Sequence, residues 1–281
     1  MQRPYDPTPR RPGIDTSRGG TSRPAWVLPA LLAAGFAVVL AAAVLLAAKD
    51  TGRRADRRWA PSLAGPDRLV TNELAYRSPG PSARRSADWV TTSGSLFVRG
   101  GHGWTGVPDR ARPDATSSTS TDSAVFRVVT ARGDFADVEV GFSLRVQRLV
   151  SAPIPERPYD GVHVYLRYQD PRWLYAVSVG RRDGRVTVKK KLPGGPRGRG
   201  VWVTLATARR PLPTGTWVEV RTRVATRPDG SVAITLDAGG QLLQALDDGR
   251  DGPPIVRPGR VGLSGDNCEF EFGDFAVDQL S

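Results

Sequence analysis

The sequence has few of the residues that form disulfides or bind transition metals. Its 281 residues include one cysteine, Cys268, and two histidines, His102 and His163. A lone cysteine excludes an intramolecular disulfide, and no Cys or His pair has the spacing of a zinc site. We therefore expect no metal and no cofactor, with a calcium site of carboxylates and carbonyls in the 247–251 loop as the alternative. Cys268 is expected to be a small buried side chain.

Lysine is also scarce, which bears on the class of partner. The chain has only Lys49, Lys189, Lys190 and Lys191, so its net charge of +12 comes almost wholly from arginine, alongside abundant Ala, Gly and Pro. This composition is typical of a GC-rich bacterial genome. Residues 59–281 carry 30 basic against 24 acidic side chains, a net charge of +6. Phosphate neutralisation has little support from so small an excess, and we expect no nucleic-acid partner.

Motifs of nucleophilic and nucleotide chemistry are missing as well. No Gly-x-Ser-x-Gly elbow, phosphate loop or dinucleotide fingerprint follows a predicted strand. The sequence therefore gives no support to a serine hydrolase or a nucleotide-dependent enzyme.

Long apolar runs are absent with one exception. Residues 25–48 carry no charge, and at about 1.5 Å per residue they are long enough to cross a hydrocarbon core of about 30 Å. Arg23 and Lys49 flank the run, and Trp26 stands where an interfacial ring is expected. A cleaved signal peptide is the alternative, but its apolar region usually has about 7–15 residues. We predict an uncleaved transmembrane helix that contacts membrane lipid.

This helix divides the chain into segments. Residues 1–24 are rich in Pro, Arg and Gly, which predicts a disordered cytoplasmic tail. Residues 49–68 are a basic linker, and residues 69–281 are the folded domain. Basic residues flank the helix on both sides, so the positive-inside rule gives no orientation. Because a short polar tail before a first helix normally stays inside, we expect the large domain to be extracytoplasmic at the cell membrane.

The folded domain has the sequence pattern of an antiparallel sheet protein. Apolar and polar residues alternate with period two in 138–146, 162–168, 218–224 and 232–236. Turn signals separate such runs: Asp170-Pro171, Arg182-Asp183-Gly184, Pro228-Asp229-Gly230 and Gly239-Gly240. We predict an all-β, two-sheet antiparallel sandwich of about 11–14 strands, preceded by one transmembrane helix.

Several of these segments together resemble a known family. The residues that carry the resemblance are DFADVEV at 134–140, GVHVYLRY at 161–168, WLY at 173–175 with RRDG at 181–184, GRVGL at 259–263 and FGDFAV at 272–277. This set resembles the concanavalin A-like lectin/glucanase jelly roll, in particular laminarinase-type and keto-disaccharide hydrolase domains. The resemblance implies a jelly roll over residues 69–281 that binds or cleaves polysaccharide on the concave face of one sheet.

Catalysis in that family would require paired carboxylates. Laminarinase-type enzymes share an E-x-D-x-E strand that places two carboxyl groups on one face, about 5–5.5 Å apart. Asp137 and Glu139 are a partial match without the third carboxylate, while Glu269 and Glu271 alternate with phenylalanines as an ordinary strand would. If the protein is a glycoside hydrolase, Asp137 and Glu139 are the candidate pair.

Sugar binding needs flat aromatic rings for the apolar faces of sugars and polar groups for their hydroxyls. The polar face of the 162–169 segment offers that mixture in His163, Tyr165, Arg167 and Gln169. Trp104 and Trp202 are expected to be aromatic residues in loops at the rim of a groove. The alternative for the histidine and tyrosine is ordinary cross-strand pairing.

The lysines after residue 188 form a second candidate surface. Arg185, Lys189 and Lys191 share one face of a predicted hairpin strand, where they would contact an anionic glycan, a teichoic-type polymer or lipid headgroups. The alternative is a solvated hairpin whose lysines protect a sheet edge.

The sequence thus favours a membrane-anchored, extracytoplasmic, lectin-like module that binds envelope or extracellular polysaccharide without cleaving it. The alternatives are a glycoside hydrolase of the same fold with an atypical carboxylate pair, and a scaffold that binds an anionic polymer or a protein partner.

Overall fold

The computed structural model describes residues 57–77, 80–108, 125–151 and 155–280. The predicted transmembrane helix at 25–48 and the tail before it lie outside these residues. Within the described ranges, no helix has both the length and the apolar character needed to cross a membrane.

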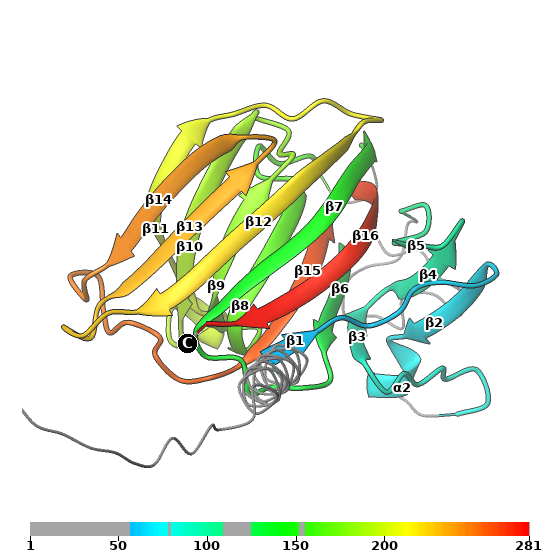
Figure 1. Ribbon diagram of the computed structural model, residues 1–281, viewed down its shortest axis with the longest axis horizontal. Coiled ribbons are helices and arrows are strands. Elements are labelled where there is room, and N and C mark those ends of the chain that lie inside the picture. The colour runs from blue at the N-terminus through cyan, green and yellow to red at the C-terminus, as the bar shows by residue number, and fades with distance from the viewer. Residues whose placement is uncertain (1–56, 78–79, 109–124, 152–154, 281) are drawn as a thin grey trace, which may run out of the picture. The chain divides into compact units, whose positions relative to one another are not determined.

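Two antiparallel sheets stacked face to face make up the described part of the chain (Figure 1). The nine-stranded sheet has the order β14 (Gln241–Asp247), β13 (Val232–Ala238), β12 (Trp217–Thr226), β7 (Val138–Leu149), β16 (Cys268–Gln279), β5 (His102–Trp104), β4 (Ser95–Arg99) and β2 (Arg68–Asn72), and β1 (Arg58–Trp59) also pairs with β16. The seven-stranded sheet has the order β11 (Val201–Arg209), β10 (Arg185–Leu192), β9 (Trp173–Val179), β8 (Gly161–Asp170), β15 (Arg260–Asp266), β6 (Val125–Thr130) and β3 (Trp89–Ser93). The prediction of an all-β, two-sheet antiparallel sandwich is confirmed, but the described residues form sixteen strands and not about 11–14.

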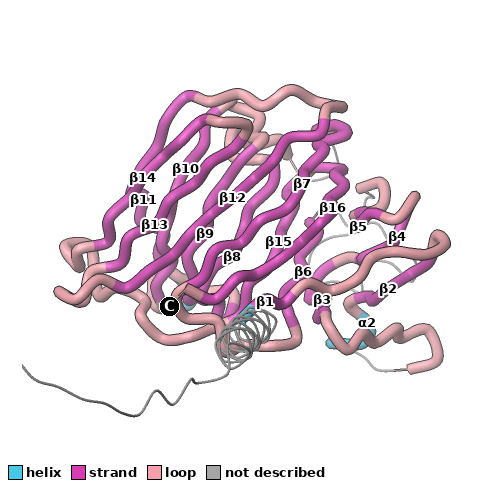
Figure 2. Tube along the Cα trace, viewed as in Figure 1, coloured by secondary structure: helices cyan, strands magenta, loops and turns pink. Residues whose placement is uncertain are grey.

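The connections between strands are mostly loops and tight turns (Figure 2). A short helix, α2 (Leu74–Arg77), follows β2, and a 3₁₀ turn, η1 (Pro196–Gly198), lies in the connection between β10 and β11. The four turns predicted from their Gly, Pro and Asp residues all lie between consecutive strands, as expected.

The period-two alternation determines what fills the space between the sheets. In β7, Val138, Val140, Phe142, Leu144 and Val146 are buried in the core, and the residues between them are only partly covered. Cys268 is buried in the same core, as predicted. Strand β8 differs, because eight consecutive residues from Gly161 are buried on both of its faces. Its outward face is therefore not a plain solvated surface.

The sandwich begins earlier than residue 69. Strand β1, within the segment predicted to be a linker, pairs with β16 through Arg58 opposite Asp278 and Trp59 opposite Val277. The Trp59 ring packs edge-on against Trp89, with centroids 5.4 Å apart. The linker prediction is wrong from β1 onward, because a single tryptophan with no alternating neighbours gives no strand signal.

Candidate functional site

A cavity of about 340 Å³ opens on the outer face of the seven-stranded sheet. Six of that sheet's seven strands contribute side chains to its lining, from β6 across to β11. The opposite side chains of the same strands, such as Val162, Val164 and Val177, belong to the core between the sheets. One sheet thus supports the core on one face and the cavity on the other.

Small residues on β9, which lies between β8 and β10, create the hollow. On β9, Ala176 and Ser178 face outward and lie opposite Tyr165 and His163 of β8. On its other side, Ala176 is paired with Lys189 of β10. Long side chains on the flanking strands and short ones between them leave a trough along β9. The cavity therefore follows from the sequence of three neighbouring strands.

Aromatic rings stand on several sides of the cavity. Tyr165 and Tyr168 stack nearly parallel, with centroids 5.7 Å apart and planes at 19°. Tyr159 and Trp202 also line the cavity and keep 45% and 47% of their surface exposed. Exposed rings at the edge of a hollow offer flat apolar faces to a ligand.

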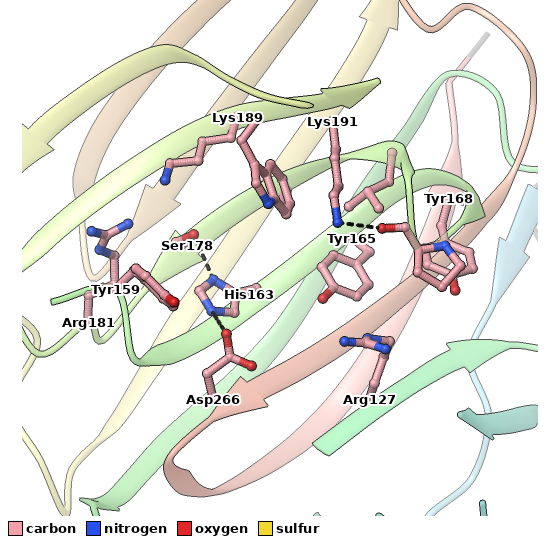
Figure 3. Close-up of a pocket in the computed structure, with 14 residues that line it drawn as sticks. Arg127, Tyr159, His163, Tyr165, Tyr168, Ser178, Arg181, Lys189, Lys191 and Asp266 are labelled. Atoms are coloured by element: carbon pink, nitrogen blue, oxygen red, sulfur yellow. Dashed lines mark hydrogen bonds and ion pairs between the residues drawn. The ribbon is translucent and has the colours of Figure 1, made fainter. Parts of the chain in front are cut away.

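A buried histidine lies in the cavity between a serine and a carboxylate (Figure 3). His163 Nδ1 is hydrogen-bonded to Ser178 Oγ at 2.7 Å, and Nε2 lies 3.3 Å from Asp266 Oδ2. Burial raises the pKa of Asp266, but its contact with His163 and the charge of Arg127 outweigh burial, so the net shift of this pKa is downward. Asp266 is thus held as a carboxylate, and it fixes the imidazole in place.

Four cations line the same cavity, from Arg127, Arg181, Lys189 and Lys191. Burial and the positive charge of Arg181 lower the pKa of Lys189. Burial and the charge of Arg127 likewise lower the pKa of Lys191. Both shifts are in the direction expected for ammonium groups that lose water and face other cations.

The structure brings together two sets of residues that the sequence analysis kept apart. His163 and Tyr165, predicted as ligand contacts, share the cavity with Lys189 and Lys191, predicted as an anionic-surface contact. Arg185 is exposed at the start of β10 and does not line the cavity. The lysines do not protect a sheet edge, because β11 covers β10 on that side.

The prediction of an outward-facing Arg167 is wrong. Arg167 has a left-handed backbone with φ of +48°, and the pairing of β8 shifts register around it. Its side chain is fully buried and donates hydrogen bonds to the Ile255 carbonyl at 2.6 Å and to Asp137 at 2.6 Å. The irregularity reverses the alternation, so that Tyr168, predicted to face the core, lines the cavity instead.

Two other predicted contacts lie away from the cavity. Gln169 donates hydrogen bonds to the carbonyls of Arg257 and Pro258 and is not part of the lining. Trp104 belongs to β5 of the nine-stranded sheet, where its ring nitrogen donates to Glu269 and the Arg99 guanidinium lies 3.9 Å from its ring centroid. It is a strand residue in an ion-pair network and not the loop residue that was expected.

The candidate catalytic carboxylates are also outside the cavity. Asp137 accepts hydrogen bonds from Arg167 and from the Thr226 backbone amide, and Glu139 lies on β7 opposite Arg223. Both are associated with the nine-stranded sheet, whereas the cavity is on the other one. These positions give Asp137 a structural partner and place neither carboxylate near the cavity's rings.

Glu269 and Glu271 are held by arginines. Glu271 is buried and accepts hydrogen bonds from Arg99, Arg145 and Gln147. Burial raises the pKa of Glu271, but the two arginines outweigh burial and the net shift of this pKa is downward. A carboxyl group held ionised in this way is a poor general acid.

Sequence reasoning missed several lining residues. Arg127 and Asp266 stand on strands β6 and β15, for which the sequence analysis predicted no outward binding face. Trp202 was flagged as a loop residue and lies on β11. The small pair on β9, Ala176 and Ser178, was the available signal, since a trough requires short side chains between long ones.

No cluster of metal-ligating side chains occurs among the residues that the structure describes. In the loop considered for calcium, Asp247 instead accepts hydrogen bonds from Lys190 Nζ and from the Tyr175 hydroxyl. Its two oxygens are thus already used by the fold.

Comparison with known proteins gives similarity only at the level of solved structures. No protein-family model matches the chain, and no curated protein matches it. Similar structures include carbohydrate-binding module CBM66 from Bacillus subtilis, with 11% identity over 68% of this chain and 95% of that chain and a TM-score of 0.46. A protein of unknown function with a galectin-like fold, also from Bacillus subtilis, has 13% identity over 68% of this chain and 89% of that chain, with a TM-score of 0.48. A prokaryotic β-1,3-1,4-glucanase (lichenase) from a mouse hindgut metagenome has 10% identity over 79% of this chain and 98% of that chain, with a TM-score of 0.46. At these values the similarity assigns neither a family nor a ligand.

Proposed function

We propose that this protein binds carbohydrate in the cavity on its seven-stranded sheet and does not cleave it. The observation that carries the proposal is the combination of exposed rings and hydrogen-bonding side chains around a floor of small residues. Rings such as Trp202 suit the apolar face of a sugar, and Lys189 or Ser178 suit its oxygens. The cavity volume of about 340 Å³ has room for one to a few sugar units.

Binding without cleavage is favoured by the carboxylates of the cavity. Glycosidases of the usual type use two carboxyl groups that flank the scissile bond. Among the described residues that line the cavity, Asp266 is the sole carboxylate, and it is engaged with His163. We further propose that the 25–48 run anchors the protein in the membrane, with the cavity facing envelope or extracellular polysaccharide.

The test uses the full-length chain in a polyoxyethylene detergent, which carries no sugar headgroup to compete. A glycan array identifies retained oligosaccharides, and calorimetry measures their dissociation constants. Replacing Trp202 by alanine should weaken binding about tenfold, close to 1.4 kcal/mol, as loss of an aromatic anchor does. Leu242→Ala is the control, because Leu242 is a large apolar side chain that is 55% exposed and lies on β14 of the nine-stranded sheet, outside the cavity lining.

Three outcomes decide the matter. Retained sugars whose affinity depends on Trp202 and not on Leu242 support the proposal. Failure to retain any sugar ends it. Release of reducing ends from a bound oligosaccharide would replace it with a hydrolase, and the carboxylate responsible would then be sought first at Asp266.

A further inference from the structure

Charge in the cavity is strongly unbalanced. Four cationic side chains line it, from Arg127, Arg181, Lys189 and Lys191, against the single carboxylate of Asp266 among the described lining residues. That carboxylate is already shared between His163 and the nearby Arg127. Asp183, outside the lining, pairs with Arg181, and a neutral sugar would still leave an excess of two positive charges without a partner.

The cations lie in two groups at separate ends of the cavity. Figure 3 shows Lys189 and Arg181 on the side of Tyr159, and Lys191 and Arg127 on the side of Tyr165. Because Lys189 and Lys191 are two positions apart on one strand, their backbones are separated by about 7 Å. Figure 3 shows the Lys189 and Lys191 side chains pointing to different sides of the cavity, so one anionic group against each neutralises both without moving either side chain.

In each group a lysine has spare capacity. The ammonium of Lys189 has no hydrogen bond or ion pair to any described residue. Lys191 Nζ donates one hydrogen bond, to the Pro171 carbonyl at 2.9 Å, and lies 5.0 Å from the centroid of the Trp202 ring. An ammonium has three donors. Arg181, by contrast, is satisfied by a two-bond pair with Asp183 at 3.0 and 2.6 Å. The free charge of that group therefore belongs to Lys189.

The lysine between them makes the contrast clear. Lys190 points to the other side of β10, is fully buried, and pairs with Asp247 at 2.7 Å. The fold therefore neutralises the lysine that it buries in the core, whereas the two in the cavity form no ion pair with any described carboxylate. Partial desolvation of an unpaired cation costs free energy, and binding of an anion offsets that cost.

We infer that the carbohydrate is an acidic oligosaccharide, with one anionic group against Lys189 and a second against Lys191 and Arg127. This inference rests on the proposed function and adds the class of sugar. The shared chemistry is an oxyanion on each of two nearby sugar units, either the carboxylate of a uronate or a sulfate ester. Aromatic contacts hold the sugar rings between these two positions.

The experiment compares charged sugars with their neutral counterparts on the full-length chain in the same detergent. The probes are hexagalacturonate, its methyl ester, a sulfated hexasaccharide and inorganic polyphosphate. We expect at least one acidic hexasaccharide to bind at least tenfold more tightly than the methyl ester. Its affinity should fall as the sodium chloride concentration is raised. The sulfated and carboxylated arms identify which oxyanion is preferred.

Charge variants locate the contact. Lys189→Gln and Lys191→Gln should each weaken binding of the preferred acidic probe at least fivefold without changing the midpoint of thermal unfolding. Arg185→Gln, which removes the same charge from the same strand outside the cavity, should leave affinity unchanged.

The possible failures are distinct. If neither hexagalacturonate nor the sulfated hexasaccharide binds more tightly than the methyl ester, with the Trp202 dependence intact, the acidic-sugar inference is overturned and carbohydrate binding is left standing. Polyphosphate binding as tight as that of the best sugar would show a general polyanion surface and overturn the inference. If no saccharide binds, charged or neutral, the proposed function itself is wrong.

Discussion

At the scale of single residues, Arg167 joins the two sheets at one end of the sandwich. It starts on β8 and reaches Asp137 and the Thr226 hydroxyl on the opposite sheet, the latter at 2.8 Å. Arg167→Met should lower the free energy of unfolding by about 3 kcal/mol, because carbonyl and carboxylate acceptors lose a charged donor inside the protein. Urea unfolding measures this loss, and Arg172→Met, at an exposed ion pair with Asp170, should change stability by less than about 0.5 kcal/mol.

The same variant separates the sequence-based interpretation of Arg167 from the structural one. If Arg167 contacts ligand, as the alternation predicted, the methionine variant loses sugar affinity and keeps its stability. His163 and Tyr165 follow that alternation, and Arg167 departs from it through a left-handed backbone at a residue that is not glycine. Sequence carries almost no signal for such a position, since non-glycine residues rarely adopt it. Residue-level prediction therefore failed where the strand became irregular.

At the scale of elements, β10 is tied to β14 of the other sheet by the buried pair of Lys190 and Asp247, which are 0% and 1% exposed. Lys190→Met should destabilise the protein by about 3–5 kcal/mol, because it leaves Asp247 buried without its cation. Adding Asp247→Leu should recover part of the loss, since neither charge then remains inside. Denaturant titration of the two variants tests this, and a double variant less stable than Lys190→Met would contradict it.

The strands themselves were the elements best predicted from the sequence. Which strands lie next to each other in a sheet was the least predictable feature. The runs at 138–146 and 162–168 became β7 and β8 because apolar side chains recur at every second residue and fill the core between the sheets. Nothing local indicated that β16 lies between β7 and β5, or that β1 joins it. The cavity depends on that order, since it forms only where β8, β9 and β10 lie side by side.

At the scale of the whole molecule, the apolar run at 25–48 predicts attachment to a membrane. Expressed in a bacterium, the full-length chain should remain with membranes washed in alkaline carbonate and dissolve only in detergent. Val39→Arg, near the centre of the run, costs about 2.5–3.5 kcal/mol on insertion scales and should shift the protein toward the wash. A product shortened by the length of residues 1–48 would instead indicate a cleaved signal peptide.

Strand β16 can pair with β7 only late in the synthesis of the chain. Arg145 of β7 and its partner Glu271 of β16 are 126 residues apart in the sequence. While the ribosome is still making the intervening segment, β7 has an unfilled hydrogen-bonding edge on that side, and a sheet built from such distant pairings folds slowly. An open edge of this kind attracts other chains. Synthesis at low temperature, or with a holding chaperone, should therefore raise the yield of native protein more than any change to its surface.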